Sequence, residues 1–593
     1  MAEQFFVKTV NNVPANSDGN VVVSATDGGT DEQNYKTISA NTTLDGSYHK
    51  AIVVIDANAD ITFPLGLRAD FTFDAFSDEN VGGLLIPAQG VTFNSNGDGN
   101  QFASKSVFKA FTRSLNNIML RGDLTTFIPP VILENYFVRP AGTIYGTGDG
   151  TSYANAFSGF SNINWSVLEN KNLNVIDTHF QMLNVQQNNV FIIGNNVNGA
   201  GIINGQNART CLEINNFNYV TISNLAMING LVANAFNRET NNTIYNDCLF
   251  DTSTNQTVQH EGANLATLIE VTYNGCTFKN GVDDGVSLHG NNTILTLNGC
   301  TFESNGQGVN AINEGVCVIN DGIFISNTVD VQPDSNADFT VNRCSFTKTL
   351  APNSSVALKI NNCIFKDEAI ISLSSNGSID LKDSKFINNS TIISRTLDLN
   401  KCKITRCYFE RGDTGSAKLS TQNNGVFNVS YCTFRHTGTG TSFLISTGSG
   451  TGTSFIENCN FIGNINANAG RGIVAGARLT ARNTIFTRLN LVTNPNGADG
   501  IVTFESCCTF SNNTINVNQN GGTFSNVNNV TTNPLFTDIA NLDFRLQSGS
   551  SCWNNGLTLT NPTGIETANF VTIFPTVITK QQTATWDRGA YIH

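Results

Sequence analysis

The sequence predicts an all-β protein whose main part is a right-handed, single-stranded parallel β-helix. The short motif Cys-x-Phe recurs about every 24 residues, and repeats of this length indicate a solenoid. Asparagine or glycine flanks many copies, and both residues favour turns. One short strand, a turn, a second strand and a turn in each repeat describe one coil of a β-helix. A leucine-rich repeat has a similar period, but the leucines and helical segments it needs are missing.

The repeat itself places two side chains inside each coil. Residues i and i+2 of a strand share a face, so each motif directs its cysteine and its phenylalanine inward. Degenerate copies begin at Gly322, Ser384 and Thr484, and an earlier copy begins at Leu225. The full copies begin at Cys248, Cys276, Cys300, Cys344, Cys363, Cys407, Cys432, Cys459 and Cys508.

Most of the fourteen cysteines occupy one equivalent position per coil. They would stack at the inter-strand spacing of about 4.8 Å, which exceeds the Cβ–Cβ distance of a disulfide, roughly 3.8 Å. We therefore expect free buried thiols that act as small apolar groups. The adjacent residues Cys507 and Cys508 are expected to point to opposite faces. The cysteine spacing matches no zinc module, and we expect neither a metal nor a cofactor.

Three regions follow from the extent of the repeat. Residues 1–128 lack it and show short alternating strands, such as 51–55, which predict a small sandwich-like or barrel-like β domain. Pro129 and Pro130 mark a junction. The β-helix is expected over 129–532. Residues 533–593 break the period and are expected to form a C-terminal cap, because an open coil exposes an unpaired edge.

Composition excludes several classes of function. The net charge is −13 with a pI near 4.9, and only 13% of the residues are charged. Nucleic-acid binding needs clustered lysine and arginine, so we expect no nucleic-acid partner. No apolar run approaches the roughly 20 residues that a membrane helix needs. The first ten residues, MAEQFFVKTV, lack the pattern of a secretory signal peptide.

Two stretches carry a family resemblance. Residues 136–140 (YFVRP) and 146–156 resemble the opening of right-handed β-helix proteins of the pectin-lyase-like superfamily. Residues 533–536, 544–546 and 587–591 are similar to the C-terminal cap of that group. The N-terminal stretches 46–48, 61–65, 90–93 and 118–123 resemble small β modules of tailed-phage virion proteins.

Together these resemblances imply a phage tail spike or tail fibre. Residues 1–128 would then attach to other tail or baseplate proteins, and the rigid body would bind polysaccharide on the host surface. Such a protein would be assembled in the host cytoplasm and act on the virion. Phage spikes of this architecture are usually trimers, which implies a homotrimer, although no heptad zipper follows the cap.

The most site-like stretch is 280–291 (NGVDDGVSLHGN). Asp283, Asp284 and His289 look similar to the Asp-Asp and Gly-His-Gly elements of β-helical polysaccharide hydrolases, although those elements lie on successive coils. Glycosidases use two carboxylates about 5–9 Å apart. Glu261, one coil earlier, and Glu314, one coil later, are the candidate second members. The alternative is that both aspartates cap a turn and His289 bonds to the backbone.

Three functions remain open on the sequence. The chain is a carbohydrate-binding tail spike or fibre, a polysaccharide depolymerase (hydrolase or lyase) on the same scaffold, or a bacterial surface adhesin. The fold alone cannot separate binding from cleavage, because this scaffold hosts both activities. We favour binding without catalysis, because the Asp-Asp and His elements lie within one coil and not on successive coils.

Overall fold

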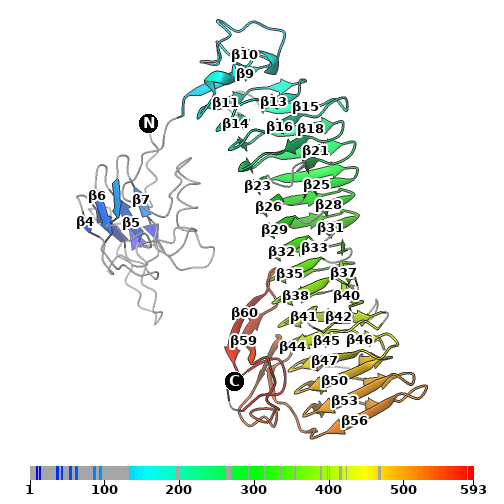
Figure 1. The fold of residues 1–593 in the computed structure, drawn as a ribbon. Helices are drawn as coiled ribbons and strands as arrows, with labels where there is room; N and C mark the ends of the chain where they lie inside the picture. The colour runs from blue at the N-terminus through cyan, green and yellow to red at the C-terminus, as the bar shows by residue number, and fades with distance from the viewer. Residues whose placement is uncertain are drawn as a thin grey trace. The chain divides into compact units, whose positions relative to one another are not determined.

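A computed structural model describes residues 133–593 together with eight short strands between Thr9 and Ser95. The segments of 133–593 outside the description are 195–200, 262–268, 291–292, 313–314, 334–336, 353–355, 375, 388–389, 397, 400, 413–416, 423, 465–468, 584 and 593. The chain divides into two units, Met1–Leu133 and Glu134–His593, which are described separately (Figure 1).

The described strands of the first unit pair mainly in parallel. One sheet contains β3 (Tyr35–Ile38), β5 (Ile52–Ile55) and β7 (Leu85–Pro87), and a second contains β4 (Thr42–Thr43), β6 (Asp60–Phe63) and β8 (Thr92–Ser95). The short strands β1 (Thr9–Val10) and β2 (Val13–Pro14) form an antiparallel pair. The stretch 118–123, which carries part of the resemblance to phage modules, lies outside the described residues.

The second unit is a parallel β-helix, as the repeat predicts (Figure 1). Each regular coil contributes one strand to each of three sheets. Sheet 1 runs from β9 (Asn135–Arg139) and β11 (Asn172–Val175) to β56 (Thr523–Val527). Sheet 2 runs from β12 (Thr178–His179) to β54 (Cys508–Phe510), and sheet 3 from β13 (Leu183–Val185) to β55 (Thr514–Asn516); each has fifteen described strands.

The first coil is closed by side chains from irregular structure. Two short 3-10 turns, Phe160–Asn162 and Trp165–Val167, follow β10 (Phe157–Ser158). They bury Phe160 and Trp165, and the Phe160 ring stacks on His179 with centroids 4.1 Å apart. This cover removes apolar surface of the first coil from water.

A ladder of stacked phenylalanines fills the interior beside sheet 2, confirming the inward direction of the motif. Neighbouring rings from Phe250 to Phe486 lie nearly parallel, with centroids between 4.4 Å and 5.1 Å. This spacing matches the inter-strand distance of about 4.8 Å. The degenerate copies keep the register, since Phe324, Phe386 and Phe486 all belong to the stack.

The last predicted copy of the motif is wrong by one residue. Cys507 occupies the inward position, where its Sγ donates to the Ala481 carbonyl at 3.3 Å. Cys508 pairs with Ile485 and Thr509 with Phe486, so Phe510 faces outward. The ring that continues the ladder comes instead from Phe504 of β53 (Ile501–Glu505), 4.6 Å from Phe486. Because sheet 1 supplies this ring, position 509 accommodates a threonine.

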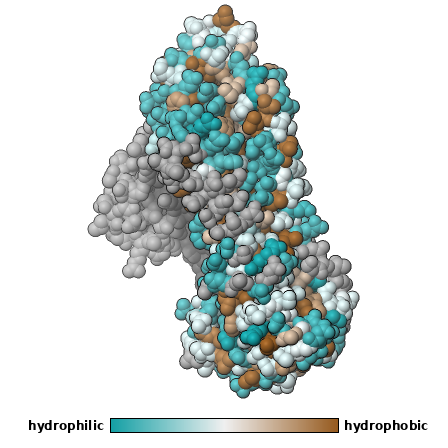
Figure 2. All heavy atoms as spheres, turned by 45° about the vertical axis from the view of Figure 1, so that its right-hand side comes forward, coloured by the Kyte–Doolittle hydropathy of each residue, from teal (hydrophilic) through white to brown (hydrophobic). Residues whose placement is uncertain are grey.

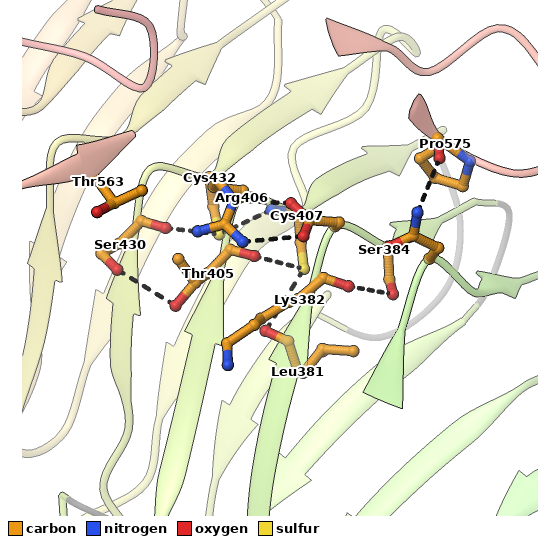
Figure 3. A network of polar contacts seen from close by, with 12 residues as sticks. Leu381, Lys382, Ser384, Thr405, Arg406, Cys407, Ser430, Cys432, Thr563 and Pro575 are labelled. Carbon is orange, nitrogen blue, oxygen red and sulfur yellow. Dashed lines mark hydrogen bonds and ion pairs between the residues drawn. The ribbon is translucent and has the colours of Figure 1, made fainter. Parts of the chain in front are cut away.

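All fourteen cysteines are free and buried, as predicted. The inward thiols donate to backbone carbonyls: Cys432 Sγ lies 3.3 Å from the Ser430 oxygen and 3.7 Å from the Ile404 oxygen. In the degenerate copy the Ser384 hydroxyl makes the same bond to the Lys382 carbonyl at 2.7 Å. Figure 3 shows this row of side chains at Ser384, Cys407 and Cys432. A thiol and a hydroxyl are therefore interchangeable at this position.

A ladder of asparagine amides runs along the end of sheet 1. Each Nδ2 from Asn274 to Asn361 donates to the Oδ1 one coil earlier, at 2.9–3.0 Å. The ladder ends at Asn361, whose Nδ2 donates to Asn342. Asn362 instead contacts the Pro575 carbonyl at 3.5 Å.

The segment 533–593 lies along the outer face of sheet 2 (red in Figure 1). It contains two antiparallel pairs, β57 (Phe536–Asp538) with β58 (Asp543–Leu546), and β59 (Thr563–Asn569) with β60 (Thr576–Gln581). Phe544 and Phe570 pack with Tyr408 and Ile462 of sheet 2, and the Tyr431 hydroxyl donates to the Asn561 carbonyl at 2.7 Å. The region expected to be a cap is therefore lateral, and most residues of β56 remain exposed.

Candidate functional site

The predicted site residues meet on the outer face of sheet 3. The strands concerned are β19 (Ala235–Arg238), β22 (Val258–Glu261), β25 (Asp284–His289) and β28 (Gln307–Ile312). Their parallel register places Phe236, Gln259, Ser287 and Asn310 in one outward row, and Arg238, Glu261 and His289 in the next. We call these seven residues with Asp284 the sheet 3 patch.

Glu261 is the centre of the first part of the patch. Its two carboxylate oxygens accept from Arg238 Nη2 and Gln259 Nε2, both at 3.0 Å. The Arg238 guanidinium also lies over the Phe236 ring, 4.9 Å from the centroid. The side chains of Arg238 and Glu261 are 41% and 34% exposed, so this ion pair is open to a ligand. A half-buried ring beside hydrogen-bonding groups suits one face of a sugar.

Asp284 is the buried carboxyl of the patch. It begins β25 and is 3% exposed. Asn310 Nδ2 donates to its Oδ2 at 3.3 Å, whereas no hydrogen bond reaches its buried Oδ1 from the described residues. Burial raises the pKa of Asp284 to about 6, against the opposing effect of hydrogen bonds from Asn310 and Ser287. A carboxyl with such a pKa exchanges its proton near neutral pH.

His289 and Ser287 link this carboxyl to Glu261. His289 Nε2 and Ser287 Oγ are 2.7 Å apart, and the Ser287 hydroxyl opposes the rise in the pKa of Asp284. Burial lowers the pKa of His289, an effect that the charge of Glu261 opposes. Asp284, Ser287 and His289 follow one another along β25, and Glu261 lies beside His289 on the neighbouring strand; we call these four residues the polar chain. His289 contacts a side chain here, unlike the alternative of a bond to the backbone.

The other two candidates lie apart from this chain. Asp283 is exposed on the turn just before β25, where its carbonyl accepts from the Gln307 amide at 2.6 Å. Its neighbour Val282 is also exposed, at 67%. Glu314 lies outside the described residues. The structure therefore brings together Asp284, His289 and Glu261, and leaves Asp283 at the rim.

His260, next to Glu261, faces the interior instead. It is fully buried, and its Nε2 lies 2.9 Å from the Tyr273 hydroxyl. Burial lowers the pKa of His260 to about 3. An imidazole that stays neutral across the physiological range, hydrogen-bonded to a buried phenol, is a structural group. The side-chain alternation of a strand separates the roles of two adjacent residues.

The polar chain supports proton exchange more readily than cleavage. A glycosidase places two carboxyl groups on either side of one bond. Here Glu261 pairs in register with His289, five positions beyond Asp284, or about 16 Å along a strand. Asp284 reaches Glu261 only through Ser287 and His289, and its low exposure keeps substrate from the carboxyl. The exposed chemistry of the patch is binding chemistry.

Arg238, Gln259, Ser287 and Asn310 are members of the patch that the motif analysis misses. Their signal is positional: once coils are aligned on the phenylalanine ladder, Gln259 and Ser287 both fall nine residues after the ring of their coil, whereas Asn310 falls eight after Phe302 and Arg238 eleven after Met227. As common polar types, they carry no signature of their own. Only the alignment of coils places them beside Glu261 and His289.

Comparison of the chain with protein-family models and with curated proteins finds no match. Among the described residues no helix is long and apolar enough to cross a membrane. The described surface in Figure 2 is mostly hydrophilic, with scattered apolar spots. The fold and the sheet 3 patch are therefore the basis for assigning a function.

Proposed function

We propose that the protein is an attachment protein of the tail-spike or tail-fibre type, which binds host-surface polysaccharide on the sheet 3 patch. The observation that carries this proposal is the in-register array of Phe236, Gln259 and the Arg238–Glu261 pair on one rigid face. Side chains repeat there at the strand spacing of about 4.8 Å. An extended polymer of similar units can contact such an array along its length.

The charge of the patch favours a neutral or weakly charged glycan. Arg238 is neutralised by Glu261, and Asp284, Ser287 and Asn310 are buried. The remaining accessible groups are the Gln259 amide, the His289 imidazole and the Phe236 ring. Hydrogen bonds and stacking would then supply affinity, with little ionic steering. The N-terminal region 1–128 would attach the body to other virion proteins.

A depolymerase is the second candidate, and the raised pKa of Asp284 favours it. Cleavage would require a movement that exposes this carboxyl and brings it to a glycosidic oxygen. Protonated Asp284 would then donate its proton to the leaving group, and Glu261 would assist attack by water or by its own carboxylate. A surface adhesin on a cell would use the same patch for binding.

The test measures retention of the full-length protein on purified bacterial capsular polysaccharides and lipopolysaccharides. We expect Phe236→Ala and Gln259→Ala to weaken retention at least tenfold on the glycan that the wild type binds. Thr277→Ala and Thr301→Ala, which change outward residues of sheet 2, are the matched controls. Equal retention of patch and control variants would reject the proposed site.

A reducing-end assay on the same glycan separates binding from cleavage. Binding alone predicts no new reducing ends with the wild type. New ends that disappear in Asp284→Asn but persist in Asp283→Asn would establish the depolymerase. An antibody against the chain should decorate the tails of intact phage particles, and decoration of bacterial cells alone would favour the adhesin.

A further inference from the structure

Cys508 and Cys552 meet where the C-terminal segment contacts the end of sheet 2. Cys508 begins β54 and points out of the coil, opposite to Cys507. Cys552 belongs to the segment 533–593. Both are fully buried in one cluster with Ile485 and Leu546. The Cys508 thiol donates to the Thr532 carbonyl at 3.4 Å, and each cysteine shifts the pKa of the other.

This pair differs from the cysteine ladder inside the solenoid. Ladder cysteines extend in parallel from neighbouring strands, and that register holds them at about the inter-strand spacing. Cys508 and Cys552 come from elements that are not paired as strands, so the register does not set the distance between their sulfurs. A small shift of the 550–553 turn is enough to change it.

The surroundings of Cys552 stabilise a thiolate. The pKa of Cys552 is lowered, first by the neighbouring Cys508 thiol, against the opposing effect of burial, and further by the positive charge of Arg588. Arg588 is buried and is held there by bonds to the carbonyls of Asn555 at 2.7 Å and Cys507 at 3.0 Å. Thiolates beside a cation and hydrogen-bond donors are the reactive form of cysteine.

We propose that Cys508 and Cys552 are a reactive pair that a low-molecular-weight disulfide, such as oxidised glutathione, converts into a disulfide bond. The Cys552 thiolate attacks one sulfur of the reagent, forms a mixed disulfide and releases one thiolate. Cys508 then loses its proton and attacks the Cys552 sulfur, which releases the second thiolate. One reagent disulfide is reduced to two thiols while the two cysteines lose two electrons.

The bond would close a covalent loop between the last coil of sheet 2 and the segment that lies along its outer face. Both thiols are buried, so the first attack occurs during local opening of the segment. Oxidation would then prevent further opening. The protein would be assembled with free thiols in a reducing compartment and locked in an oxidising one.

The test compares full-length protein incubated with oxidised glutathione and with a reductant. After denaturation, the reduced sample should titrate all fourteen thiols, and the oxidised sample two fewer. Peptide mapping without reduction should recover one linked pair, containing Cys508 and Cys552. All fourteen thiols remaining in the oxidised sample, or a linkage between other cysteines, would overturn the proposal.

Variants add a second readout on the folded protein. In Cys552→Ser, glutathione treatment should remove no pair of thiols, whereas the ladder variant Cys432→Ser should still lose two. Oxidised wild-type protein should resist proteolysis of the 533–593 segment longer than reduced protein, and this difference should vanish in Cys552→Ser. The same protection in Cys552→Ser would overturn the proposed lock. The mapping on wild-type protein decides the question if a variant fails to fold.

Discussion

Sheets 2 and 3 share one backbone geometry but have different outer faces. On sheet 2, Tyr408 and Ile462 pack under the C-terminal segment and are almost fully buried. On sheet 3, Arg238 and Glu261 are partly exposed and bond to each other. The interior of both sheets is the same kind of apolar core.

The contrast shows that the inward residues of each coil determine the fold, whereas the outward residues can vary. Side chains alternate across a strand, so outward positions can change without disturbing the inward ladder. In this protein, sheet 2 uses that freedom to hold the chain's own C-terminal segment. Sheet 3 uses it to present polar groups.

The largest expected difference between the faces is in stability. Tyr408→Ala removes a ring that stacks on Phe570 at 5.2 Å and should lower the free energy of unfolding by about 3 kcal/mol. Phe236→Ala, on the half-exposed face of sheet 3, should lower it by less than about 1 kcal/mol. Urea unfolding with proteolysis of the C-terminal segment measures both. Equal losses would contradict the distinction between the faces.

The buried carboxyl of sheet 3 should make stability depend on pH. The pKa of Asp284 is about 6 in the folded protein and about 3.9 when unfolded, so the folded state holds the proton more tightly. The contribution of Asp284 to the free energy of unfolding therefore falls as the pH rises from about 4 to 6, and it stays low at higher pH. Asp284→Asn should stabilise the protein by about 2 kcal/mol at pH 8 and hardly at all at pH 4.

Asp283→Asn is the matched control for this pH effect, because Asp283 is exposed. Its unfolding midpoints at pH 4 and pH 8 should follow those of the wild type. A stabilisation of Asp284→Asn that is equal at both pH values would show that the carboxyl does not titrate as described.

Loss of one amide from the asparagine ladder should lower the free energy of unfolding by an intermediate amount. Asn298 donates to Asn274 and accepts from Asn320, both at 2.9 Å, so Asn298→Ala should cost about 1 kcal/mol. Asn184 is an exposed amide on sheet 3, and Asn184→Ala should be nearly neutral. Thermal unfolding of the two variants compares a laddered amide with a solvated one.

The smallest effect is expected for the Arg238–Glu261 pair. Exposed ion pairs contribute little, so Arg238→Gln should change the free energy of unfolding by less than about 0.5 kcal/mol. Its glycan retention should nevertheless fall, since the variant leaves Glu261 charged and without its partner. A large loss of stability with unchanged retention would assign the pair to the scaffold instead.

The fold was predictable because the repeat is regular along most of the chain. The errors of the prediction have a physical reason. At Cys507–Cys508 only Cys508 fits the motif, through Phe510, yet Cys507 takes the inward position because Phe504 supplies the ring from another sheet. The sequence also contains an indication of the lateral position of the C-terminal segment. The middle residue of the motif faces outward, and it becomes Ile364, Tyr408 and Ile485 in the coils that this segment covers, where all three are buried.

The site was predictable only in part. Coil spacing correctly indicated that Glu261 and the 280–291 stretch lie on neighbouring strands. The separate environments of Asp283 and Asp284 depend on where β25 begins, which the sequence pattern does not fix. The role of Ser287 depends on a contact with His289 two residues away. A serine at this position does not by itself indicate such a contact.

The ladder of inward phenylalanines also has a consequence for how such a chain can vary. Each ring stacks on the rings of the adjacent coils, and repeat proteins are stabilised mainly by such nearest-neighbour contacts. Removing one complete coil would therefore join two compatible surfaces, whereas removing half a coil would place the following strands in the wrong sheets. The solenoid can gain or lose length in whole steps of about 24 residues. The length of the β-helix and the outward side chains that bind a ligand can therefore change independently of each other.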